Sequence, residues 1–105
     1  MEKILNDFNT FVSELVIYHM KMDKFVSIDY LAEKTGLSVS FIQKALYKPS
    51  EKHFNSRHIF LLANAMYIDS SELMPSKNNY RKITNKEIDK IEWEKFINRV
   101  RGGKE

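Results

Sequence analysis

Residues 27–47, SIDYLAEKTGLSVSFIQKALY, have the pattern of two short helices joined by a tight turn. Ala32 is small enough to let a second helix cross closely, and Gly36 can take the left-handed backbone conformation that ends a helix. Leu37 and Ile42 are then expected to face back onto the first helix. Each of these positions therefore has a steric reason to carry its residue.

The order L-A-x-x-x-G-L-S-x-x-x-I, from Leu31 to Ile42, resembles the helix-turn-helix of the phage repressor and Cro family, also called the xenobiotic-response-element type. The likeness continues through LLANAMYIDSSELM, which looks like the family's closing segment, so it covers roughly residues 27–74. It implies an all-α fold, a compact four-to-five-helix domain, and a regulator, expected to be a repressor, that binds double-stranded DNA through the major groove.

The resemblance also assigns roles to individual residues of the second helix and of the segment after it. Its base-facing residues would be Val39, Ser40, Gln43 and Lys44. Gln can bond an adenine edge through two hydrogen bonds, and Lys can reach guanine O6 and N7 or a phosphate. Contacts with phosphates are expected from Ser27, Ser38, Lys48, Lys52, Asn55, Ser56 and Arg57, joined at lower pH by His53 and His58.

Three positions depart from the family's pattern. Ile28 stands where the family often has a glutamine, Leu46 where an acid is common, and Tyr67 where a glycine follows the fourth helix. A bulky residue at positive φ is costly, which argues against a left-handed backbone at Tyr67.

The net charge of +3 is unevenly distributed along the chain. Residues 1–37 and 59–76 each sum to −2, whereas residues 38–58 sum to +3 and residues 77–105 to +4. Positive charge therefore collects on the second helix of the pair, on the loop after it and on the C-terminal third, as a surface that faces phosphates requires.

Flanking segments are predicted to supply the core. Apolar residues at spacings of three and four predict an amphipathic helix from residue 2 to about 22: Ile4, Leu5, Phe8, Phe11, Val12, Leu15, Val16 and His19. Residues 48–58, KPSEKHFNSRH, are expected to be an irregular loop because they contain Pro49 and a cluster of Ser and Asn. A helix from about Arg57 to Tyr67 and a short helical turn from Ser70 to Met74 follow.

The C-terminal third is predicted to be a separate element after a helix-turn-helix domain at residues 1–75. Residues 76–84 are polar and basic without periodicity, so they are expected to be a linker. Thr84 and Glu87 form a capping-box pattern that predicts a helix from Asn85 to about Val100, within a segment of residues 85–101.

This last helix is expected to carry two apolar faces. Trp93, Phe96, Ile97 and Val100 would lie on one face, with Ile88 and Ile91 nearly opposite. One face could pack on the chain's own body and the other on a second copy, giving a homodimer, or both could fold back onto residues 1–74.

Composition argues against several other classes of protein. Cys is absent, which fits a reducing compartment, and no apolar run or basic leader indicates a membrane span or secretion, so a cytoplasmic protein is expected. His53 and His58 are five residues apart, the wrong spacing for metal ligands on one helix face. Catalytic motifs are missing too, so neither an enzyme nor a cofactor is expected. The remaining alternative is a helix-turn-helix scaffold that acts mainly through a protein partner, as an antirepressor, an antitoxin or a CRISPR inhibitor.

Overall fold

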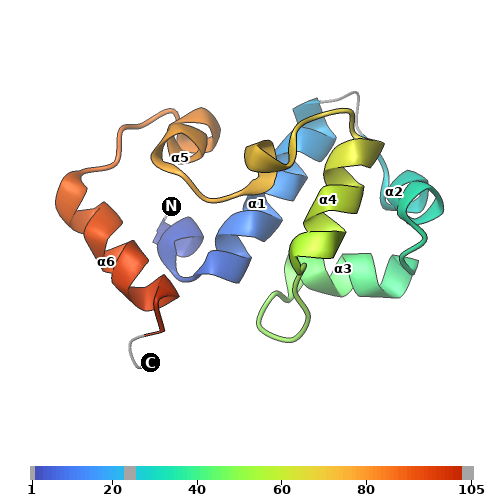
Figure 1. The fold of residues 1–105 in the computed structure, drawn as a ribbon, viewed down its shortest axis with the longest axis horizontal. Helices are drawn as coiled ribbons and strands as arrows, with labels where there is room; N and C mark the ends of the chain where they lie inside the picture. Colours follow the sequence, from blue (N-terminus) through green and yellow to red (C-terminus); the bar gives the residue numbers. More distant parts are fainter. Residues whose placement is uncertain (1, 23–25, 103–105) are drawn as a thin grey trace.

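Helices make up the fold throughout the part of the chain that this computed structural model describes, residues 2–22 and 26–102. In chain order they are the 3-10 helix η1 (Glu2–Leu5), α1 (Phe8–Met22), α2 (Ile28–Thr35), α3 (Val39–Tyr47), α4 (Ser56–Ala65), the 3-10 helix η2 (Ser70–Leu73), α5 (Lys77–Thr84) and α6 (Lys90–Val100) (Figure 1). These ranges contain no β-strand, so the predicted all-α class is confirmed.

The central helix is α1, which lies between the α2–α4 group and the C-terminal helices (Figure 1). Its residues Phe11, Leu15 and Val16 are fully buried, as their spacing predicts. The prediction of one helix from residue 2 to 22 is wrong at its start, because the chain breaks between η1 and α1. There the Asp7 carboxylate accepts a hydrogen bond from the Thr10 amide at 2.7 Å, which gives α1 its own N-terminal cap.

The segment from α2 to α3 is held by hydrogen bonds between residues close in sequence. The Ser27 hydroxyl accepts from the Tyr30 amide and caps α2, and the Ser38 hydroxyl accepts from the Phe41 amide and caps α3, each at 3.0 Å. Between them Gly36 has φ +81° and donates its amide to the Ala32 carbonyl, which ends α2.

The end of α4 differs from the sequence prediction. Tyr67 does adopt a left-handed backbone, with φ +60°, although it is bulky. Its amide donates to the Asn64 carbonyl, and the next amide, that of Ile68, donates to the Ala63 carbonyl. The chain thus closes α4 with the geometry that glycine favours, at the expense of local strain.

The predicted linker and the predicted start of the last helix are both wrong. Residues 77–84 form α5, capped by Ser76, and Thr84 ends this helix instead of beginning the next. Asn85 takes φ +63° as the C-cap of α5, and α6 begins only at Lys90, where the Asp89 carboxylate accepts from the Ile91 and Glu92 amides. The Thr84–Glu87 pattern is therefore not a capping box.

The core continues into the C-terminal third. Phe96 of α6 is buried, and its ring lies 5.5 Å from that of Phe11, which also meets the ring of Tyr80 of α5 at 6.4 Å. Asn79 is buried as well, and its side-chain amide donates to the Ser71 and Met74 carbonyls, which ties α5 to η2. Among the described residues, none of the helices is long and apolar enough to span a bilayer.

Candidate nucleic-acid interface

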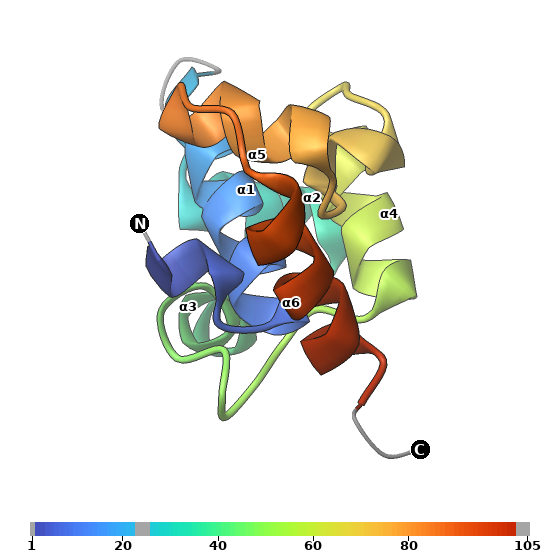
Figure 2. The same ribbon diagram turned by 90° about the vertical axis from the view of Figure 1, so that its left-hand side faces the viewer.

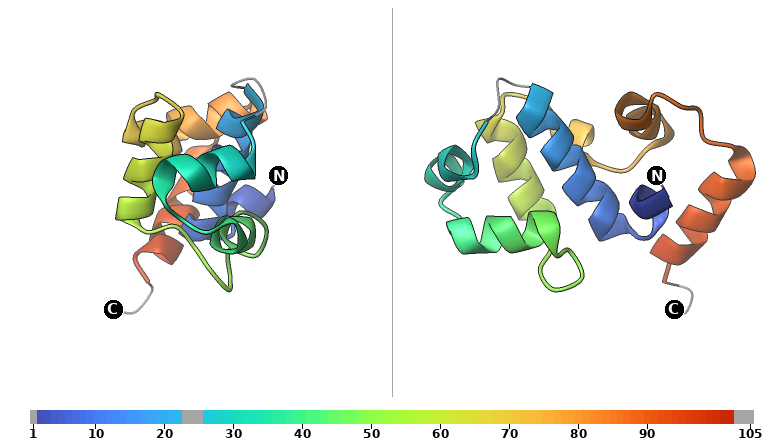
Figure 3. Two further views of the ribbon diagram at one scale, coloured as in Figure 1. Left: turned by 90° about the vertical axis from the view of Figure 1, so that its right-hand side faces the viewer. Right: turned by 180° about the vertical axis from the view of Figure 1, so that it is seen from behind.

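Helix α3 has one buried face and one exposed face. Ile42, Ala45 and Leu46 are buried against α1 and α2. All four residues predicted to face bases lie on the exposed side: Val39, Ser40, Gln43 and Lys44. Figure 1 and the rear view in Figure 3 both show α3 along the lower edge of the molecule, next to the loop that leads to α4.

The end of α3 is held by a hydrogen bond from the core helix. The Ser13 hydroxyl donates to the Ala45 carbonyl at 2.6 Å, and Ser13 is buried. In a continuing helix this carbonyl would accept from the amide four residues later, but that residue is Pro49, which has no amide hydrogen. Ser13 therefore supplies the donor that the sequence of α3 cannot.

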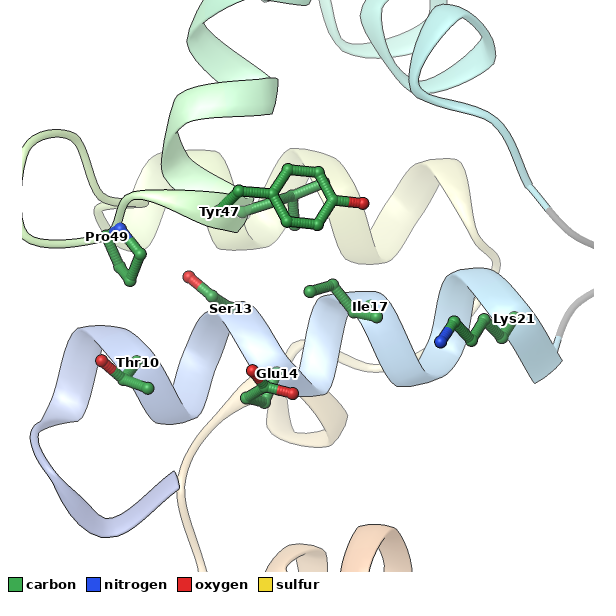
Figure 4. Close-up of a pocket in the computed structure, with 8 residues that line it drawn as sticks. Thr10, Ser13, Glu14, Ile17, Lys21, Tyr47 and Pro49 are labelled. Carbon is green, nitrogen blue, oxygen red and sulfur yellow. The ribbon is translucent and has the colours of Figure 1, made fainter. Parts of the chain in front are cut away.

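A cavity of about 290 Å³ lies beside this contact, between α1 and the end of α3. Figure 4 shows the Tyr47 ring and Pro49 on one side, and side chains of α1 on the other. The residues that line the cavity are Thr10, Ser13, Glu14, Ile17, Lys21, Leu46, Tyr47 and Pro49.

The residues predicted to contact phosphates are all exposed: Ser27, Ser38, Lys48, Lys52, Asn55, Ser56 and Arg57. Three of them already cap helices, because Ser27, Ser38 and Asn55 accept backbone amides with their side-chain oxygens. Their hydroxyl hydrogens, and the side-chain amide of Asn55, can still donate to an anion. The lysines and Arg57 supply the charge.

His58 has a structural role that the sequence prediction missed. Its Nδ1 accepts from the Asn55 amide at 3.1 Å, while the Asn55 side chain accepts from the His58 amide at 2.9 Å, so the two residues form a capping box at the start of α4. The imidazole also packs against Phe41 of α3, with ring centroids 4.8 Å apart. The imidazole thereby links α3 to the loop and to α4.

The same surroundings favour the neutral form of the His58 imidazole. Burial lowers its pKa below the ordinary value of 6.5, and the nearby charges of Arg57 and His53 lower it further. Protonation would turn Nδ1 from an acceptor into a donor. The hydrogen bond from the Asn55 amide, and with it the capping box, would then be lost. His53, by contrast, is exposed and takes no part in the capping box.

The residues predicted for dimerisation divide into two groups. Phe96 is buried, and Trp93 and Ile88 are partly buried against the same core. Ile91, Ile97 and Val100 remain exposed on α6. The described part of the chain contains no group of three or more His, Asp or Glu side chains placed to hold a metal ion.

No protein-family model, curated protein or solved structure matches this chain.

Proposed function

We propose that this chain is a helix-turn-helix transcriptional regulator that reads the major groove of double-stranded DNA with α3. The observation that carries the proposal is that one side of this helix is exposed and the other is buried. Gln43 and Lys44, the two side chains best suited to base edges, are exposed together with Ser40, while the opposite side of α3 is buried in the core. Val39 can add a contact with a thymine methyl group.

The charge around α3 supports the same proposal. Lys48, Lys52 and Arg57 are exposed on the loop and at the start of α4, with Glu51 as the single acid between residues 38 and 58. Contacts between such residues and phosphates fix the register of a protein on DNA and make its affinity depend on salt.

Two copies of the chain are proposed to act together. A regulator that reads two half-sites one turn apart, about 34 Å, needs two recognition helices related by a two-fold axis. Helix α6 offers exposed apolar residues for such a contact, namely Ile91, Ile97 and Val100.

The test is a fluorescence-anisotropy titration of the protein on DNA from its own upstream region, at two salt concentrations. Gln43→Ala combined with Lys44→Ala should weaken binding at least about tenfold, because a bidentate base contact contributes roughly 1–3 kcal/mol. Lys77→Ala is the matched control, since it removes an exposed lysine from α5. A double variant that binds as tightly as the wild type would rule out α3 as the reading helix.

A scaffold that binds a protein through the same helix is the second candidate. The side chains at the two ends of α3 favour it, since Val39 is 38% exposed and Tyr47 is 64% exposed. Exposed apolar side chains of this kind are common in protein interfaces. Val39→Ser with Tyr47→Ser would then abolish capture of the partner, and the unmodified protein would show no preference for its upstream DNA over unrelated duplex.

A further inference from the structure

The cavity of about 290 Å³ between α1 and the end of α3 has a mainly apolar wall. On the α3 side this wall consists of Leu46, Pro49 and the ring of Tyr47. On the α1 side Ile17 adds an aliphatic surface at the middle of the cavity (Figure 4). The volume is close to the lower end of the range for sites that bind small molecules, about 300–1,000 Å³, so it suits a ligand with one ring or two.

Two charged residues of α1 give the cavity two different ends. Glu14 and Lys21 both line it and are seven residues apart, which is roughly 10 Å along the helix axis. Figure 4 shows Ile17 between them, with the Lys21 ammonium directed back toward Ile17. Lys21 makes no ion pair with any described residue. One end of the cavity therefore attracts an anion, and the other end disfavours one.

Tyr47 adds a second polar group toward the Lys21 end. In Figure 4 its hydroxyl points along α1 in the direction of Lys21. The hydroxyl and the ammonium can both donate hydrogen bonds, and two donors suit the two oxygens of a carboxylate. The Tyr47 residue is 64% exposed, so contacts within its own chain cover little of the ring. An aromatic ligand stacked on this ring would bury more of it.

We propose that this cavity binds a small aromatic monocarboxylate and that the ligand regulates DNA binding, the second part resting on the proposed function. The ligand's carboxylate accepts hydrogen bonds from the Lys21 ammonium and the Tyr47 hydroxyl. Its ring lies between Tyr47 and Ile17, against the apolar wall. Glu14 disfavours a second acidic group at the far end, so a dicarboxylate of the same shape binds less well.

A ligand in this cavity would act on α3 because the end of that helix forms one wall. The Ser13 hydroxyl, which also lines the cavity, donates to the Ala45 carbonyl of α3. A ligand held by both Lys21 and Tyr47 adds contacts across the same junction, and so favours the position of α3 against α1. The exposed face of α3 is presented to DNA in this position. The ligand should therefore raise the affinity for DNA, and DNA should raise the affinity for the ligand by the same factor.

Titration of the isotope-labelled full chain with phenylacetate, followed by NMR, tests ligand binding directly. Saturable shifts should appear within residues 10–21 and 45–49, which contribute the walls of the cavity. Three relatives of the probe should each bind at least about tenfold more weakly, since each loses a charge-assisted hydrogen bond or gains a repulsive charge. These relatives are the neutral phenylacetamide, the cationic phenethylamine and the dicarboxylate para-phenylenediacetate.

Variants of the chain test the two donors. Lys21→Met keeps the apolar stem and removes the charge, so it should raise the dissociation constant of phenylacetate at least about tenfold, and Tyr47→Phe about threefold. Lys77→Met is the matched control and should leave the dissociation constant unchanged. Figures 1 and 2 both show α5, which carries Lys77, along the upper edge of the molecule and α3 toward the lower edge.

Three results would overturn the site. The first is phenylacetate that gives no saturable shifts at these residues. The second is a Lys21→Met variant that binds phenylacetate as tightly as the wild type does. The third is equal binding of phenylacetate and phenylacetamide, because the cavity would then not recognise the negative charge.

Anisotropy titration on upstream DNA, with and without saturating phenylacetate, tests the regulation. The ligand should tighten DNA binding by the wild type at least about fivefold, and should leave DNA binding by Lys21→Met unchanged. If the chain binds phenylacetate but its DNA affinity stays the same or falls, the regulation is wrong and the proposed function stands. If it binds phenylacetate and does not bind DNA, the proposed function is wrong and the ligand site stands.

Discussion

The Ser13 hydroxyl donates to the carbonyl oxygen of Ala45, at 2.6 Å and across 32 residues of sequence. This bond joins the central helix to the helix proposed to read DNA, at the carbonyl that Pro49 leaves without its usual partner. The contact is buried, so its loss would leave the Ala45 carbonyl without a donor from the protein.

Ser13→Ala should therefore lower the free energy of unfolding by about 1–3 kcal/mol, the usual cost of leaving one buried polar group unsatisfied. Urea denaturation followed by circular dichroism measures the change. Ser40→Ala, an exposed serine on α3, is the control and should change stability by less than about 0.5 kcal/mol. Equal effects at the two serines would show that the Ala45 carbonyl is satisfied in another way.

Tyr67→Asn should stabilise the protein. The backbone at this residue has φ +60°, which costs a non-glycine residue about 1–2 kcal/mol and which Asn tolerates better. The exposed ring loses little burial, so an increase in Tm of roughly 4–8 °C is expected. Calorimetry at several protein concentrations separates this gain from any change in self-association. Tyr47→Asn, at a helical backbone, should bring no gain.

Gly36→Ala should destabilise the protein by about 1–2 kcal/mol through backbone strain alone. Gly36 has φ +81°, and a Cβ atom added there would meet no other atom within 4 Å. Gly36→Asn should therefore cost clearly less, since Asn tolerates the left-handed region without steric conflict. If both variants were equally unstable in chemical denaturation, crowding and not φ would be the cause.

Stability should fall as the pH drops below 6.5, through His58. Its pKa is lower in the folded chain than in the unfolded chain, so the unfolded chain binds the proton more readily in this range. The stabilisation is thus fully present above the unfolded value of 6.5 and is lost as pH falls through the lower folded pKa. His58→Gln keeps an acceptor for the capping box but does not titrate, so its urea midpoint should vary less between pH 7 and pH 5.

Removal of positive charge beside α3 should reduce the salt dependence of DNA affinity. Lys52→Ala combined with Arg57→Ala removes two proposed phosphate contacts, so the slope of log affinity against log salt should fall by about 2. Lys77→Ala with Lys86→Ala removes the same charge from elsewhere on the surface. Equal slopes for the two double variants would mean that the salt dependence follows net charge, and not the position of the charges beside α3.

Local sequence rules predict the α2–α3 region well because its signals are short-range. Ser27, Gly36 and Ser38 each act on backbone groups within four residues, and Gly36 ends α2 as predicted. The exposed positions of Gln43 and Lys44 likewise follow from helical periodicity.

Helix α5 could not be predicted in the same way because its support comes from other segments. The Asn79 amide donates to carbonyls five and eight residues earlier, and Tyr80 packs on Phe11. The sequence of the segment on its own is polar and basic, without the periodicity that would predict a helix. The prediction for Thr84 is wrong for a related reason. Its hydroxyl donates to the Tyr80 carbonyl and accepts from the Lys86 amide, which closes α5.

The contact between Phe11 and Phe96 also bears on when this protein can fold. Phe11 leaves the ribosome early, yet its ring packs against a residue 85 positions later, near the other end of the chain. Domains fold as units during synthesis, so this core stays open until α6 has emerged. Nascent chains stalled before Phe96 should therefore remain sensitive to protease, although every residue proposed to touch DNA has by then been synthesised.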